Sequence, residues 1–103
     1  MIVIAQYKGN SVTALRVGQR NARRYFERSN PTIEFELDHL RIECGLPPKF
    51  WDGEAEIRDR RLCAWLESKH HPHRSPHRDV TLDMTPSGGN SFRLMPMHSR
   101  RPD

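Results

Sequence analysis

Five arginines between residues 16 and 28 are the clearest group in this sequence that could do chemistry. The arginines are Arg16, Arg20, Arg23, Arg24 and Arg28, and the aromatic Tyr25 lies among them. In a helix, Arg20, Arg23 and Arg24 would form a ridge on one face. Guanidinium groups bind phosphates through paired N–H donors, and a tyrosine can stack on an unpaired base. Gln19 and Asn21 could add amide contacts to bases or sugars. The cluster therefore predicts non-catalytic binding of DNA or RNA, mainly through phosphate.

The charge distribution offers a competing interpretation of these arginines. The net charge is +4, and it divides into about +5 over residues 1–30, −4 over 31–67 and +3 over 68–103. The arginines could therefore pair with the acidic middle segment and form an ordinary solvated helix face. No helix-turn-helix, RNA-recognition, KH or zinc-finger pattern is present to decide between the two.

A run of histidines follows, formed by His70, His71, His73 and His77. Neutral imidazoles this close together are weak candidates for metal ligands. Prolines break the helical spacing, however, and the neighbouring Arg74 and Arg78 repel a cation. We therefore predict no native metal site and no cofactor. The preferred interpretation is a basic linker whose Arg74 and Arg78 contact phosphate and whose charge rises as the pH falls.

Acidic and thiol side chains raise the alternative of an enzyme. Asp52, Glu54 and Glu56 would share a face in an extended segment, where carboxylates can hold Mg²⁺. Cys44 and Cys63 are isolated and are expected to be reduced thiols rather than a disulfide or a zinc site. No known catalytic fingerprint is present. A small metal-dependent enzyme is thus the least favoured function, and the sequence leans against catalysis.

The elements that must position these residues follow from periodicity and turn signals. The stretch around Leu62, Trp65 and Leu66 has one apolar stripe at helical spacing, with Asp59 as its N-cap. Strands are predicted at 2–7, 12–17, 32–37, 79–84 and 91–97, and helices at 19–28, 38–44 and 59–70. A single helix from Ser11 to Arg28 is the rival to the first hairpin, although Gly18 would weaken it. The predicted core is Ile4, Leu15, Phe26, Phe35, Leu40, Leu62, Trp65, Leu66, Leu82 and Phe92.

These elements predict a small single α+β domain with a mostly antiparallel sheet, two or three short helices and a flexible basic C-terminal tail. The domain should cover residues 1–97, with an exposed His/Pro/Arg linker at 71–78 and a disordered tail at 98–103. The longest apolar run, Ile2 to Ala5, is too short to cross a membrane, and no signal peptide precedes it. No membrane partner and a cytoplasmic location are therefore expected.

The C-terminal hairpin supports an alternative function. Pro96 suggests that the last strand lies at a sheet edge. Met95 and Met97 would then face outward and form an adaptable surface for another chain. This alternative is a protein–protein adaptor or a homodimer. Phe50 and Trp51 are expected to plug the edge of the core rather than to form an exposed interaction spot.

Overall fold

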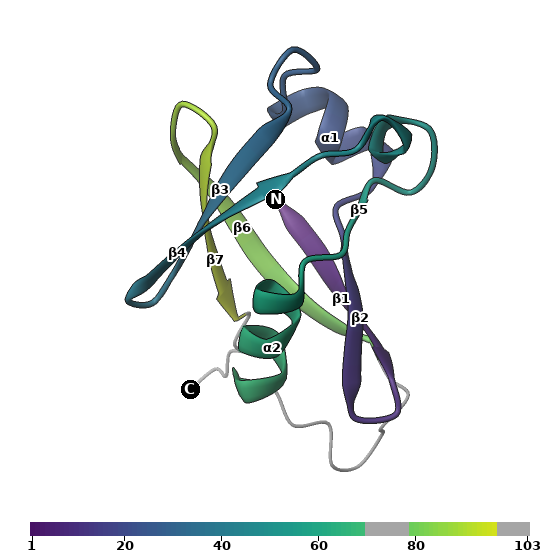
Figure 1. Cartoon of the computed structure of the whole chain (residues 1–103), viewed down its shortest axis with the longest axis vertical. Helices are drawn as coiled ribbons and strands as arrows, with labels where there is room; N and C mark the ends of the chain where they lie inside the picture. The colour runs from purple at the N-terminus through teal and green to yellow at the C-terminus, as the bar shows by residue number, and fades with distance from the viewer. Residues whose placement is uncertain (70–78, 97–103) are drawn as a thin grey trace, which may run out of the picture.

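A computed structural model describes residues 1–69 and 79–96 of the chain (Figure 1). The predicted linker at 71–78, the tail at 98–103, Met97 and His70 lie outside the described residues. Within those ranges the elements are β1 (Ile2–Lys8), β2 (Ser11–Arg16), α1 (Gln19–Tyr25), β3 (Thr32–Leu37), β4 (Leu40–Gly45), the 3₁₀ helix η1 (Pro48–Trp51), β5 (Glu56–Ile57), α2 (Arg60–Lys69), β6 (Val80–Gly88) and β7 (Ser91–Pro96).

The seven strands form one sheet in the order β4-β3-β7-β6-β1-β2-β5. All neighbouring pairs are antiparallel except β3 and β7, which run parallel, with Phe35 opposite Phe92. The sheet is strongly curved, so that β4 and the β2–β5 end approach each other from opposite sides (Figure 1). The α+β class is confirmed, but the sheet is mixed. The prediction that the last strand lies at an edge is wrong, because β7 pairs with β6 on one side and β3 on the other.

The predicted helix at 38–44 is also wrong, because this segment forms strand β4. Asp38 has φ 52, and with His39 it makes a two-residue turn that returns the chain directly onto β3. Ile42 and Cys44 then alternate with exposed Arg41 and Glu43, which is strand periodicity. The predicted cap at Asp38 is thus a hairpin turn, and an aspartate is one of the few residues that tolerate this conformation.

Helix α1 has the predicted start but ends earlier than expected. Gly18 adopts φ 89, a conformation that favours glycine and that separates the hairpin from the helix. This excludes the rival single helix from Ser11 to Arg28. Phe26 leaves the helix in extended conformation, and its ring stacks on Phe50 and Phe92 with centroids 5.6 and 4.9 Å apart. The extended conformation of Phe26 thus coincides with the end of the helix and with its place in the aromatic stack.

The inner face of the curved sheet encloses an apolar core. Eight of the ten predicted core residues are buried, and the two exceptions are Ile4 and Leu40. Ile4 lies on the outer face of β1, because its neighbours Val3 and Ala5 point inward. Leu40 is 54% exposed, because it follows the β3–β4 turn instead of lying on a helix. Phe50 is fully buried and Trp51 packs partly buried against the core, as the plug hypothesis requires.

Helix α2 lies in the opening between β4 and β2 (Figure 1). As predicted, Asp59 caps it by accepting from the backbone N–H groups of Arg61 and Leu62 at 2.8 and 3.1 Å. Two of its side chains reach the flanking strands. Glu67 accepts from the backbone N–H of Val12 on β2 at 2.8 Å, and Arg61 donates to the carbonyl of Glu43 on β4 at 2.9 Å. The helix therefore bridges the two sides of the opening through side-chain contacts.

The far end of α2 is attached to the β3–β4 turn. The carboxylate of Asp38 accepts from the indole N–H of Trp65 at 3.2 Å and pairs with Lys69 at 2.7 Å. These contacts, with the Lys69 ammonium first among them, hold the pKa of Asp38 below its usual range. Neither helix in the described ranges has the length and apolar content that a bilayer span requires.

Candidate nucleic-acid interface

Helix α1 and the turn that follows it present four of the predicted arginines to solvent. The inward side is made by Ala22 and by Phe26, which follows the helix, and both are buried. We call the exposed set the α1 basic surface, and it consists of Arg20, Arg23, Arg24 and Arg28. Arg20, Arg23 and Arg24 are all exposed on the helix, as the predicted ridge requires.

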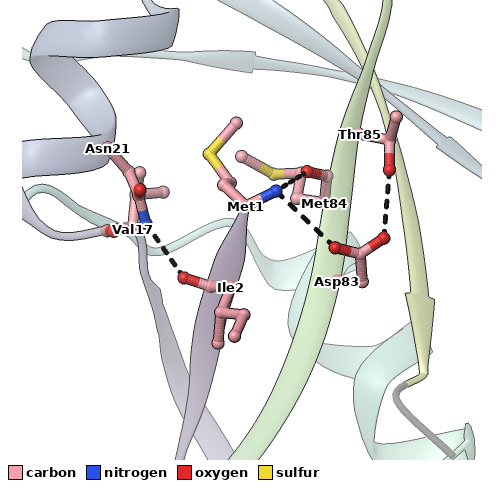
Figure 2. A network of polar contacts seen from close by, with 7 residues as sticks. All are labelled: Met1, Ile2, Val17, Asn21, Asp83, Met84 and Thr85. Atoms are coloured by element: carbon pink, nitrogen blue, oxygen red, sulfur yellow. Dashed lines mark hydrogen bonds and ion pairs between the residues drawn. The ribbon is translucent and has the colours of Figure 1, made fainter.

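The two amide side chains of α1 anchor the helix instead of lying free. Asn21 donates to the carbonyls of Ile2 and Val17, each at 2.9 Å, which ties the helix to β1 and to the end of β2 (Figure 2). Gln19 donates to the carbonyls of Trp51 and Gly53. The expectation that these amides contact bases or sugars is therefore not supported by their positions. Their role is to hold the α1 basic surface against the sheet and η1.

The polar network beneath α1 continues along β1 into β6. Figure 2 shows the Met1 ammonium group donating to the carbonyl of Met84 at 2.7 Å and lying 3.6 Å from the Asp83 carboxylate. Thr85 donates to the same carboxylate at 3.1 Å. Strand β1, which carries the Asn21 contact, is thus fixed in the middle of the sheet.

The ion pairs show whether the arginine cluster is paired with the acidic middle segment. Over residues 1–69 and 79–96, none of the four guanidinium groups of the α1 basic surface forms an ion pair with a carboxylate. The acidic middle segment is paired with other cations, for example Glu34 with Arg41, Glu56 with Arg58 and Asp59 with Arg61. The surface is therefore not neutralised by the segment that the competing interpretation invoked.

Arg16 is separated from this surface. It lies on β2, and its guanidinium is 3.8 Å from the carboxylate of Asp79 at the start of β6. Its side chain is 30% exposed, so it is less accessible than the residues of α1. The structure thus divides the predicted cluster into four exposed arginines on and just after α1 and one arginine paired within the sheet.

Two aromatic rings lie under cations at this end of the molecule. The guanidinium of Arg24 is 5.9 Å from the centroid of the Tyr25 ring, and Tyr25 is 39% exposed. The guanidinium of Arg28 is 5.2 Å from the centroid of Trp51 in η1. Because η1 packs beside α1, the exposed Lys49 adds a further cation. The stacking of Phe26 on Phe50 holds η1 beside this surface, and no local pattern in the sequence predicts that contact.

A cleft lies between the facing ends of the sheet and was not predicted. It has a volume of about 500 Å³ and extends from Cys44 and Gly45 of β4, past η1, to β5 and the start of α2. Two of its carboxylates form ion pairs, Glu56 with Arg58 inside the cleft and Asp59 with Arg61. Only the strand order brings these segments together, so no motif could have revealed the cleft.

The geometry gives no support to a nucleophile or to a metal centre in the part of the chain that is described. Burial, together with the neighbouring Asp59 carboxylate, raises the pKa of Cys44 to about 12. Burial also raises the pKa of Cys63. Both thiols are thus protonated at neutral pH, and a thiolate is the nucleophilic form. Among the described residues, no three His, Cys, Asp or Glu side chains are grouped so that they could hold a metal ion.

Six of the remaining sequence candidates lie outside the described residues. They are His70, His71, His73, Arg74, His77 and Arg78. Of the three predicted carboxylates, Glu54 and Glu56 line the cleft described above, whereas Asp52 does not, and Glu56 pairs with Arg58. Comparisons of the chain with protein-family models, with curated proteins and with solved structures gave no match.

Proposed function

We propose that this protein binds nucleic acid without catalysis, through phosphate contacts made by the α1 basic surface. The observation that carries the proposal is the set of four exposed arginines that have no carboxylate partner within the described ranges. Guanidinium groups that are free of internal ion pairs can give their paired N–H donors to phosphate oxygens.

The surroundings of the surface favour a polyanion over a small anion. Arg20, Arg23, Arg24 and Arg28 extend along α1 and beyond its end, and Lys49 lies on the neighbouring η1. A row of cations suits the repeated charges of a nucleic-acid backbone better than a single phosphate. The half-exposed Tyr25 provides an aromatic face, which can stack on an unpaired base. We therefore expect single strands to bind at least as well as duplexes, with little base readout.

The test is a salt titration of binding to labelled single- and double-stranded oligonucleotides by fluorescence anisotropy. Affinity should fall steeply with salt, because bound phosphates release counterions. The double variant Arg23→Glu with Arg24→Glu should bind about tenfold or more weakly, and it should reduce the slope of log affinity against log salt by about 2.

A matched control separates the surface from net charge. Lys8→Glu with Arg60→Glu changes the net charge by the same amount at two exposed positions outside α1. The control should retain most of the affinity. Absence of binding at low salt, or an equal loss in both double variants, would contradict the proposal.

A further inference from the structure

Strand β4 ends the sheet among the described residues, and one of its two sides has no strand partner. The direction of its backbone groups follows from the next strand. The N–H of Glu34 on β3 bonds to Asn90 beside β7, so it points away from β4. Its antiparallel partner on β4 is Glu43, whose N–H and carbonyl must therefore point away from β3. The Arg61 guanidinium confirms this, because it donates to that carbonyl from outside the sheet.

Alternation along the strand extends the argument to the neighbouring positions. Residues two apart have the same backbone direction, so the free edge of β4 presents the N–H and carbonyl groups of Arg41, Glu43 and Gly45. The side chains of Arg41 and Glu43 are both exposed on the outer face of the sheet. The opposite end of the sheet offers less, because β5 contains only two residues, Glu56 and Ile57.

The edge of β4 is complementary to itself. If a second copy pairs antiparallel with Ile42 opposite Ile42, then Arg41 lies opposite Glu43 of the second copy, and Glu43 lies opposite its Arg41. Both residues have their backbone groups on the free edge, as a hydrogen-bonded antiparallel pair requires. Each such pair also sets a cation opposite an anion on one face, which stabilises a sheet.

The two symmetric registers centred on the neighbouring edge residues are unfavourable. Shifting the two-fold axis to Glu43 sets two glutamates directly opposite each other, and shifting it to Arg41 sets two arginines opposite each other. Like charges in directly opposed positions destabilise a strand pair. The register centred on Ile42 also covers Leu40, which is 54% exposed, by placing it opposite Cys44 of the second copy. Charge and apolar exposure thus favour the register centred on Ile42 over these two.

We propose that this protein forms a two-fold symmetric dimer in which β4 pairs antiparallel with β4 of a second copy, centred on Ile42. The hydrogen bonds to Arg41 and Glu43 of the second copy replace the single contact that Arg61 makes with the Glu43 carbonyl. The side chain of Arg61 is 62% exposed, so it is free to move aside. The dimer joins two sheets into one and is independent of the α1 basic surface. It relocates the predicted homodimer from the C-terminal hairpin, which lies inside the sheet, to an actual edge.

The test is sedimentation velocity of the full chain over a wide concentration range, with a charge swap. Wild-type protein should show a concentration-dependent monomer–dimer equilibrium. Arg41→Glu alone and Glu43→Arg alone should each raise the dissociation constant by about tenfold or more, because two symmetric pairs become repulsive. The double variant Arg41→Glu with Glu43→Arg should restore the dimer, since the opposite charges are exchanged but remain opposed.

Lys8→Glu is the control for Arg41→Glu, because it makes the same charge change at an exposed position on β1. A variant that fails to fold is recognised by circular dichroism, and amide hydrogen exchange of the wild-type protein then gives a second readout. The N–H groups of Arg41 and Glu43 should become more protected as the protein concentration rises. A wild-type monomer at every concentration, failure of the double variant to recover, or exchange that does not depend on concentration would overturn the proposal.

Discussion

Two parts of this molecule hold neighbouring segments together in different ways. From β3 through β7, β6 and β1 to β2, backbone hydrogen bonds join each strand to the next, and the inner face is apolar. In the part of the chain that the structure describes, no strand joins β4 to the β2–β5 end, and α2 lies in the opening (Figure 1). There, side chains of α2 form hydrogen bonds with the strand edges, Arg61 with β4 and Glu67 with β2. Backbone N–H and carbonyl groups are therefore bonded to a neighbouring strand in the first part and to helix side chains in the second.

The difference shows what a helix can and cannot supply at a sheet edge. A strand offers one donor and one acceptor at every second residue, whereas α2, within the described residues, gives β2 and β4 one side-chain hydrogen bond each. Edge groups therefore remain on β4, and a cleft remains beside β5. The helix compensates by burying Leu62, Trp65 and Leu66. We infer that apolar packing holds α2 in place and that its polar bridges mainly satisfy exposed edge groups.

The largest effect should come from the apolar side of α2. Leu66→Ala should lower the free energy of unfolding by about 3 kcal/mol, because Leu66 is fully buried and its loss leaves a cavity. Urea denaturation followed by circular dichroism measures this. Ala64→Gly, on the exposed side of the same helix, should cost about 1 kcal/mol through helix propensity alone. Equal losses in the two variants would show that packing does not anchor the helix.

A smaller effect is expected at the helix cap. Asp59→Ala should cost about 1 kcal/mol at neutral pH, because the N–H groups of Arg61 and Leu62 lose their acceptor. Burial of the Asp59 carboxyl opposes its ionisation. The hydrogen bonds from the Arg61 side chain and from these two N–H groups together outweigh burial and lower its pKa. The contribution is therefore fully present above the unfolded-state pKa and is lost as the pH falls through the lower folded-state value.

A variant that caps the helix but cannot titrate is the control for this pH dependence. Wild-type stability should decline as the pH falls from about 5 towards 2. Asp59→Asn keeps a capping oxygen but cannot titrate, so its stability should decline less over the same range. Unfolding free energies at several pH values give the comparison. A decline in Asp59→Asn as steep as that of the wild type would assign the acid sensitivity to other carboxyl groups, such as Asp38, whose pKa is lowered first of all by Lys69.

The smallest effect should come from the polar bridge to β4. Arg61→Met removes the donor to the Glu43 carbonyl but keeps an unbranched side chain. Because that contact is exposed, the loss should be the smallest of the three and close to the error of the measurement. Thermal unfolding under matched conditions is the measurement. A loss as large as that of Leu66→Ala would mean that the opening is closed by polar contacts, contrary to the packing interpretation.

The sequence predicted most elements because their patterns are local. Thr32–Leu37 alternates apolar and acidic residues, and it forms the predicted strand. Asp59 and the stripe of Leu62, Trp65 and Leu66 gave α2 with its cap. The prediction of a helix at 38–44 was wrong because an aspartate such as Asp38 is common both as a helix cap and in turns. Only pairing of Ile42 with Phe35 on β3 decided in favour of a strand.

The candidate site was predictable only in part, for a similar reason. Exposure of Arg20, Arg23 and Arg24 followed from their helical spacing opposite Phe26. The pairing of Arg16 with Asp79 did not, because it depends on two strands that are far apart in sequence. The interior position of β7 was missed for the same reason. Pro96 indicated an edge, but it stands at the end of the strand, beyond the part of β7 that pairs with β3.

The strand order has a consequence for the way the chain folds. In the order β4-β3-β7-β6-β1-β2-β5, the hairpins β1–β2 and β3–β4 do not touch within the sheet, because β6 and β7 lie between them. A nascent chain that has been synthesised only as far as α2 therefore lacks the two strands that join these hairpins into one sheet. Closing such distant contacts is slow, since chain entropy is lost before they form. The last hairpin to be synthesised is thus the one that completes the sheet.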